Sequence, residues 1–311
     1  MDRRDFIVKS SAASLLACFP ASLAGLERRA LGRTGERLSV IGFGGIVVMN
    51  ATAQEASSRV AEAIDHGVNY FDVAPSYGNA EEMLGPALAP YRKGVFLACK
   101  TTERSRDGSQ RELDNSLRTL RTDHFDLYQL HAVNSRDDVE KIFAPGGALE
   151  TFVAAKKAGK VRFLGFSAHS VEAALALIGR YDFDTILFPT NFATWHAGSF
   201  GPQVLAAAQA KQMGILALKA MARGPWPKDA KRDTYPKCWY EPLAAPDDAM
   251  MGLRFTLSHP VTAAIPPGDE TLFKQALGLA LRFTPLKDDE ARAIKEKGLA
   301  SAPLFKFPSW A

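Results

Sequence analysis

The sequence is poor in cysteine. Its 311 residues contain only Cys18, Cys99 and Cys238. None of them stands in a Cys-x-x-Cys pair or beside a histidine pattern typical of metal ligands, so a zinc or iron–sulfur site is not expected and no metal is assigned. The cysteines lie far apart and give no sign of a disulfide. The chain also lacks a hydrophobic run long enough for a stable membrane anchor, and it has no low-complexity tract.

An excess of charge of one sign is absent as well. The formal net charge is +4. No stretch combines a run of Lys and Arg with interleaved aromatic residues, so nucleic acid is not an expected partner. No apolar run is followed by the Gly-x-Gly-x-x-Gly turn of a doubly wound dinucleotide-binding sheet, which disfavours that open fold.

What the chain does contain is a regular alternation of short apolar runs and helix-length amphipathic segments. Helices are expected over Gln54–Asp65, Ser109–Leu120 and Gln203–Met213. Eight strands are expected at Ser39–Phe43, Asn69–Val73, Val95–Cys99, Asp126–Leu130, Val161–Phe166, Asp184–Phe188, Ile215–Leu218 and Val261–Ile265. This number of βα units predicts an α/β fold with one closed (β/α)8 TIM barrel.

Two stretches depart from the repeat. Arg28–Ser39 contains Gly32 and Gly35 between short extended pieces and predicts an N-terminal β-hairpin that caps the barrel bottom. Ala222–Asp248 is a long, irregular segment after the seventh strand, and loops of this length are usually functional or disordered. Because it follows the seventh strand, at the rim where α/β barrels carry their chemistry, we expect it to cover a substrate pocket.

Four chemically active residues end apolar runs or follow them closely: Asp72, Tyr77, Lys100 and His131. If the runs are neighbouring parallel strands, these side chains converge at the rim where α/β barrels carry their chemistry. A carboxylate, a phenol, an ammonium and an imidazole in one apolar cleft form a proton donor of tuned pKa. Each residue alone has an ordinary structural role as its alternative.

The constellation resembles the aldo-keto reductase superfamily. The segments that carry the resemblance are LGRTG (31–35), VIGFGG (40–45), GVNYFDVAPSYG (67–78), AEEMLG (80–85), GFSAH (165–169) and IPPG (265–268). The resemblance runs from Leu26 to the C-terminus. It implies an oxidoreductase that transfers a hydride between NADP (NAD possible) and a small-molecule aldehyde or ketone. In that scheme Tyr77 is the general acid, Lys100 lowers the pKa of its phenol, Asp72 keeps Lys100 charged, and His131 orients the carbonyl.

The resemblance also implies cofactor-binding residues, namely Ser167, Asn191, Lys219 and Gly268. The chain departs from the common family pattern here, with Ala168 after Ser167, Leu187 in place of a glutamine, and Leu218 in place of a stacking aromatic. For Ser167 and Asn191 the alternative is loop and capping chemistry.

The resemblance also implies that coenzyme choice is made in the segment after the eighth strand. Asp269 and Glu270 would repel the 2′-phosphate that distinguishes NADP from NAD, and Lys274 would partly offset them. We therefore expect NADP to be used and NAD to be accepted within about tenfold.

Two other functions remain open at this point. One is a nucleotide-binding regulatory or redox-sensing protein on the same fold with little turnover. The other is a barrel lyase or sugar isomerase that uses a Lys–His pair without nicotinamide.

The N-terminus resembles a twin-arginine export signal. Arg3-Arg4 is followed by Phe6-Ile7 and Lys9, then by a short apolar stretch and small residues up to Ala24. The resemblance implies a signal peptide over 1–24, transient contact with the Tat export machinery, and a periplasmic barrel domain over 25–311. The protein is cytoplasmic if the signal is not used, and a plain N-terminal tail is the alternative.

Overall fold

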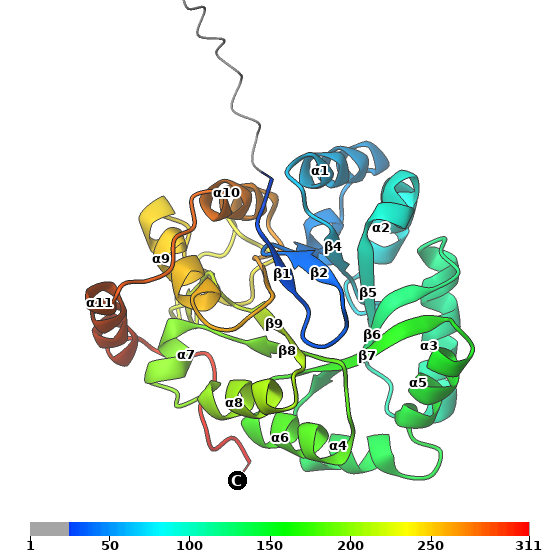
Figure 1. Cartoon of the computed structure of the whole chain (residues 1–311). Helices are drawn as coiled ribbons and strands as arrows, with labels where there is room; N and C mark the ends of the chain where they lie inside the picture. The colour runs from blue at the N-terminus through cyan, green and yellow to red at the C-terminus, as the bar shows by residue number, and fades with distance from the viewer. Residues whose placement is uncertain (1–24, 311) are drawn as a thin grey trace, which may run out of the picture.

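A computed structural model describes residues 25–310 and shows a barrel of parallel strands surrounded by helices (Figure 1). Within these residues one sheet has eight strands, all parallel, and they follow chain order around the barrel. They are β3 (Phe43–Gly44), β4 (Tyr70–Asp72), β5 (Phe96–Thr101), β6 (Phe125–Val133), β7 (Val161–Ala168), β8 (Thr185–Pro189), β9 (Gly214–Leu218) and β12 (Ala263–Ile265). The barrel closes where Ile41 bridges Ala264 and the Gly42 N–H donates to the Ala264 carbonyl at 3.0 Å. The expected (β/α)8 fold is confirmed.

The sequence analysis predicted a first barrel strand that begins too early in the chain. The predicted strand Ser39–Phe43 is divided, because Ser39 pairs with Arg28 in the N-terminal hairpin and only Phe43–Gly44 pairs with β4. Gly42 lies where a Cβ atom would meet the Tyr70 ring at 2.4 Å, so a glycine is needed where the chain passes from the hairpin into the barrel.

Helices fill the outer layer. They are α1 (Ala53–Asp65), α2 (Ala80–Leu88), α3 (Arg106–Thr119), α4 (Arg136–Phe143), α5 (Ala148–Lys157), α6 (Val171–Arg180), α7 (Phe192–His196), α8 (Pro202–Ala210), α9 (Pro246–Leu257), α10 (Glu270–Ala280) and α11 (Asp288–Leu299). Helix α1 shows how the sequence sets them. Thr52 and Glu55 form a capping box, and Val60 lies on the face buried against the barrel. None of the helices within residues 25–310 is long and apolar enough to cross a membrane.

The N-terminal hairpin closes the bottom of the barrel. Strands β1 (Arg28–Ala30) and β2 (Arg37–Ser39) are antiparallel, and Leu31 and Leu38 are fully buried against the barrel interior. Gly32 has φ +51°, and a Cβ atom there would lie 2.3 Å from the Gly214 nitrogen. The hairpin therefore packs directly on the lower end of β9. The predicted N-terminal hairpin at the barrel bottom is confirmed.

The barrel interior changes character along its axis. Successive side chains of a strand point to opposite faces, so residues two apart share the interior. The lower layers are apolar, with Tyr70, Phe96 and Leu127 among the buried residues. Two residues further along two of these strands stand Asp72 and Gln129, both buried. The same alternation that builds the core thus delivers polar side chains to the upper rim.

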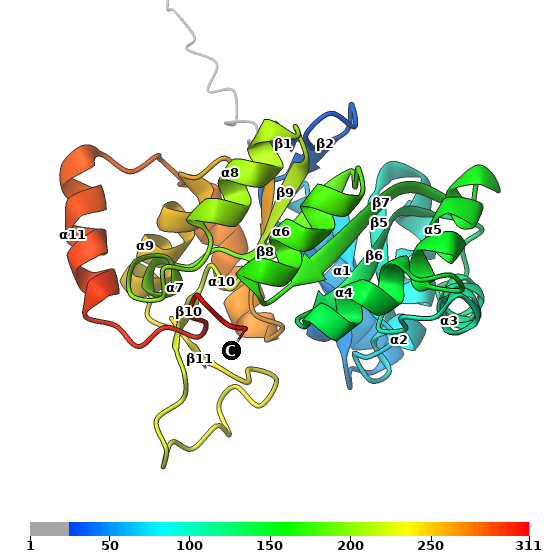
Figure 2. The same cartoon turned by 90° about the horizontal axis from the view of Figure 1, so that it is seen from below.

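The segment after β9 lies on the other end of the barrel. Strands β10 (Ala222–Gly224) and β11 (Glu241–Pro242) pair antiparallel. Figure 2 shows the chain between them projecting on the side opposite the β1–β2 hairpin. The Trp226 indole N–H donates to the Cys238 carbonyl at 2.8 Å and ties the two halves of this segment together. We call residues 225–240 the lid.

Candidate active site

The structure brings Asp72, Tyr77, Lys100 and His131 together at the upper rim. The Lys100 ammonium donates to Asp72 Oδ1, to the Tyr77 phenol oxygen at 3.2 Å and to the Val73 carbonyl at 3.3 Å. The rings of Tyr77 and His131 meet edge to face with centroids 5.5 Å apart. Lys100 is thereby fixed between a carboxylate and a phenol, and an imidazole stands beside the phenol.

Two residues that the sequence reasoning missed hold the carboxylate in place. The Tyr70 hydroxyl donates to Asp72 Oδ2 at 3.1 Å, and Gln129 Nε2 donates to the same oxygen at 2.9 Å. Tyr70 lies two residues before Asp72, and Gln129 lies two residues before His131, so both share the interior face of their strands. That period of two was the signal that could have found them.

Burial dominates the protonation of the phenol. Burial raises the pKa of Tyr77 above its ordinary value, and the Lys100 ammonium lowers it by less. Burial lowers the pKa of Lys100, but the Asp72 carboxylate and Tyr77 outweigh it and the pKa is raised overall. The sequence reasoning anticipated the effect of Lys100 on Tyr77 but not the larger opposing effect of burial. At neutral pH the pair is a protonated phenol beside a charged ammonium.

His131 is neutral in this environment. Burial first, and then the charge of Lys100, lower its pKa to about 3. The Ser76 hydroxyl lies 3.2 Å from Nδ1. Donation from Ser76 to Nδ1 puts the ring proton on Nε2, which leaves that N–H free to donate to a substrate oxygen.

The four residues open into a cavity of about 220 Å³. Its walls come from the barrel rim and the lid, and they include Ser167, Lys219 and Gly268. This volume is below the ~300–1,000 Å³ of most small-molecule sites. Lys237 of the lid accounts for part of the closure, since it donates to the carbonyls of Ile46 and Val47 at 3.2 Å each.

Asn191 is placed differently from the other three candidate cofactor residues. Its Oδ1 accepts from the backbone of Ala193 and Thr194, and its Nδ2 donates to the carbonyls of Lys219 and Ala222. Asn191 is buried and does not line the cavity. In this structure it caps α7 and holds the backbone of Lys219, which agrees with the capping alternative, and direct contact with a cofactor stays a prediction.

Three features of the cavity and its border bear on dinucleotide binding. Gly268 packs so closely on Ile46 that a Cβ atom would lie 2.3 Å from Ile46 Cγ2, so only glycine fits at this point of the cavity wall. Leu187 and Leu218 supply apolar walls for a flat ring. Asp269 is the N-cap of α10 and accepts from two N–H groups of its first turn, so those donors are already occupied.

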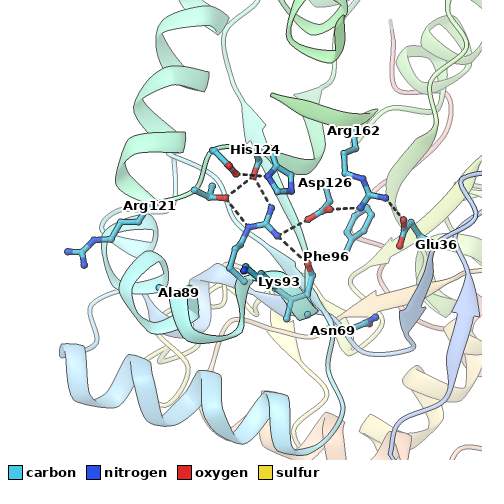
Figure 3. A pocket seen from close by; sticks show the side chains of 14 residues that line it. Glu36, Asn69, Ala89, Lys93, Phe96, Arg121, His124, Asp126 and Arg162 are labelled. Carbon is cyan, nitrogen blue, oxygen red and sulfur yellow. Dashed lines mark hydrogen bonds and ion pairs between the residues drawn. The ribbon is translucent and has the colours of Figure 1, made fainter. Parts of the chain in front are cut away.

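A larger concavity lies at the opposite end of the barrel, away from the four residues (Figure 3). Its floor is an ion-pair chain in which Asp126 accepts from both Arg92 and Arg162, and Arg162 reaches Glu36. The Leu97 N–H also donates to Asp126 at 2.9 Å. These charges satisfy one another, and we interpret this end as structural, consistent with the stabilising role of the lower face in such barrels.

Comparison with known proteins agrees with this geometry. The profile of the aldo/keto reductase family matches residues 40–240, and the chain belongs to that family. An aldo-keto reductase of Bacillus subtilis, YhdN, is 31% identical over 166 residues, covering 47% of this chain and 48% of its own length. L-galactose dehydrogenase of Arabidopsis thaliana is 26% identical over 217 residues, covering 64% and 66%. The chain spans about half the length of most of the curated relatives that it matches.

Among solved structures, an aldo-keto reductase from Klebsiella pneumoniae in complex with NADPH superposes with a TM-score of 0.69. It is 22% identical and the match covers 90% of this chain and 98% of that one. At this identity the likeness establishes the fold.

Proposed function

We propose that this protein is an NADP(H)-dependent oxidoreductase that interconverts a carbonyl and an alcohol. The observation that carries the proposal is the position of the Lys100 ammonium between the Asp72 carboxylate and the Tyr77 phenol, 3.2 Å from the phenol oxygen. Family membership and the oxidoreductases among its relatives support it.

Each of the four side chains has a separate role in proton transfer. When bound, the nicotinamide supplies the hydride. Tyr77 donates its proton to the oxygen that becomes the alcohol, and Lys100 stabilises the phenolate that remains. Asp72 keeps Lys100 charged, and the Nε2–H of neutral His131 donates to the carbonyl oxygen and orients it. In the reverse direction the same phenolate accepts the proton of the alcohol.

We assign NADP as the cofactor, with NAD accepted. Support comes from the Klebsiella pneumoniae relative, whose structure contains NADPH. In this chain Ser167 and Gly268 would hold the nicotinamide amide and a phosphate, and Lys219 would contribute a positive charge, while Asn191 would act through the backbone of Lys219.

The two other functions find less support. No observation on residues 25–310 favours a regulatory protein with little turnover. The cavity holds an intact ion pair with a phenol, which a lyase or isomerase that uses only a Lys–His pair would not need.

We further propose that residues 1–24 are a twin-arginine signal and that the protein acts in the periplasm after cleavage at Ala24. These residues lie outside the part of the chain that the structure describes. The proposal rests on Arg3-Arg4 and the small residues that precede Gly25.

The test of activity is direct. The purified chain from residue 25 is mixed with NADPH and a panel of aldehydes and ketones, and loss of absorbance at the reduced nicotinamide is followed. The expected result is turnover that is strongly reduced by Tyr77→Phe. Binding of NADPH without turnover of any carbonyl would favour the regulatory alternative, and no binding would favour the isomerase.

A further inference from the structure

The catalytic cavity carries more positive charge than its ion pair accounts for. Three lysines line its walls, namely Lys100, Lys219 and Lys237, together with the neutral imidazoles of His131 and His169. Among the described residues that line it, Asp72 is the only carboxylate, and Asp72 is already paired with Lys100. A cavity of this composition is matched to a ligand with negative charge.

Within residues 25–310, the Lys219 ammonium has neither an ion-pair partner nor a hydrogen bond. Lys100, by contrast, pairs with Asp72, and Lys237 donates to two backbone carbonyls.

Lys219 follows β9 with φ +68°, a conformation that side chains other than glycine rarely adopt. Asn191 holds this strained backbone by donating to the Lys219 carbonyl at 3.2 Å. The ammonium lies 5.0 Å from the ring centre of Trp239 and 4.7 Å from that of Tyr240. The aromatic rings of two lid residues thus stand where a carboxylate would be expected.

The protonation of Lys219 reflects these surroundings. Burial lowers its pKa to about 8, so most of the population is charged at neutral pH. Cation–π contacts stabilise such a group only in part. A bound anion would supply the missing counter-charge.

His169 presents a second unmatched polar group on the same cavity. Its Nε2 is buried and has no hydrogen-bond partner within residues 25–310. Its ring stacks on Phe305 with centroids 5.1 Å apart, which fixes its plane. Burial and the charge of Lys219 lower its pKa to about 3, so the ring is neutral. Buried polar groups nearly always have a partner, and because His169 lines the cavity, its partner can be a water molecule or a bound ligand there.

We propose that Lys219 and His169 form an oxyanion-binding site in the catalytic cavity, which takes a carboxylate or phosphate group of a bound ligand. The oxyanion would pair with the Lys219 ammonium and accept a hydrogen bond from the His169 ring. The oxyanion can belong either to a charged substituent on the carbonyl substrate or to the diphosphate of the dinucleotide. Binding of a substrate substituent rests on the proposed function, whereas the existence of the anion site does not.

The first experiment measures anion binding without turnover. Oxalate and inorganic pyrophosphate are titrated calorimetrically into the ligand-free chain and into Lys219→Met, Lys219→Arg and His169→Asn. We expect Lys219→Met to weaken binding of at least one anion about tenfold or more, the loss expected of a hydrogen-bonded charge, with recovery in Lys219→Arg. Lys141→Met removes the same charge from an exposed i,i+4 pair and serves as the control.

The second experiment identifies the source. The ratio of kcat/KM for 3-carboxybenzaldehyde and its neutral analogue 3-carbamoylbenzaldehyde is compared in native and Lys219→Met protein, together with the Kd of NADPH. A fall of about tenfold in the ratio at unchanged Kd assigns the anion to the substrate. A comparable rise in Kd at an unchanged ratio assigns it to the dinucleotide. If the carbonyls are not turned over at all, the proposed function fails while the calorimetric result still stands.

The pH dependence of anion affinity is an independent test of the same site. Lys100, His131 and His169 from the barrel rim, and Cys238 and Tyr240 from the other wall, surround Lys219. Lys219 has a pKa of about 8, while burial holds the pKa of Cys238 at about 11 and both imidazoles are neutral above pH 5. Anion affinity should therefore fall as the pH rises above 8. The proposal is overturned if Lys219→Met alters neither anion binding, nor the substrate ratio, nor the Kd of NADPH.

Discussion

Replacing Tyr77 by phenylalanine removes one oxygen from the site. In the structure that oxygen accepts from Lys100 at 3.2 Å, while Lys100 keeps its contacts with Asp72 and with the Val73 carbonyl. The ion pair should therefore survive the substitution. What disappears is the phenol that protonates the reduced carbonyl.

The expected size of the effect follows from general acid catalysis. Loss of a positioned proton donor lowers turnover by about 10²–10⁴, which corresponds to roughly 3–5 kcal/mol of activation free energy. The Kd of NADPH should change by less than about threefold, since Tyr77→Phe removes no charge from the cavity. Burial raises the pKa of Tyr77, so the reduction rate of the native protein should stay level through neutral pH and decline only at alkaline pH.

The assay is steady-state NADPH oxidation with the best aldehyde of the panel, combined with fluorescence titration of NADPH. Tyr70→Phe is the matched control. This substitution also removes one phenol oxygen from the site. That oxygen donates at 3.1 Å to Asp72, the carboxylate that pairs with Lys100, but it takes no part in proton transfer. We expect this control to lose about 1.5–3 kcal/mol of stability and less than about tenfold in turnover.

The assignment of Tyr77 is refuted by a Tyr77→Phe variant that retains near-native turnover with a folded structure. It is also refuted if Tyr70→Phe and Tyr77→Phe reduce turnover equally, because the loss would then reflect the position of Asp72 and Lys100.

Four other predictions follow from the structure and the sequence. The Asp126→Asn variant should lose about 3 kcal/mol of stability in urea unfolding, because Arg92 is left without its buried partner at the lower end of the barrel, and its turnover should be unchanged. The control Glu36→Gln, at a more exposed ion pair, should cost less than about 1 kcal/mol. Burial lowers the folded-state pKa values of His131 and His169 to about 3, below the unfolded value of 6.5. The contribution of these neutral imidazoles to the free energy of unfolding should therefore be complete above pH 6.5 and decline as the pH falls toward 3. Equal urea midpoints at pH 7 and pH 4 would contradict this. NAD should be accepted within about tenfold of NADP in kcat/KM, because Lys274 is paired with Glu62 and Glu270 and is not free to bind a 2′-phosphate. A far stronger preference for NADP would show that another cation binds the 2′-phosphate. Replacing Arg3 and Arg4 by lysine should retain the precursor inside the cell, and an intact mass that begins at residue 1 in the exported protein would argue against cleavage.

Much of the architecture was readable from the sequence. Buried parallel strands are short apolar runs, and the intervening segments repeat their apolar residues at helical spacing, so the number and order of the βα units could be counted. Asp72, Lys100 and His131 lie at or near the ends of such runs, and parallel strands bring their carboxyl ends to one rim. The long segment after β9 was identified by its length and irregularity.

Other features required the three-dimensional arrangement. The first strand was misplaced because Ser39 pairs with Arg28 in the hairpin, a contact that local apolar pattern does not encode. Asp126 is buried beside two arginines from distant parts of the chain, and only the closed barrel brings Arg92 and Arg162 to it. Such partners are set by packing between distant segments.

The chemistry of the site shows the same division. The sequence determined which acids and bases this protein has and the order in which the strands deliver them, because strand period and chain order are local properties. Only the tertiary structure decided their protonation and their partners. Burial outweighs Lys100 in setting the pKa of Tyr77, and Asn191 is turned inward to hold the strained backbone of Lys219. These outcomes depend on solvent exclusion and on distances across the barrel, which no segment of the chain specifies alone.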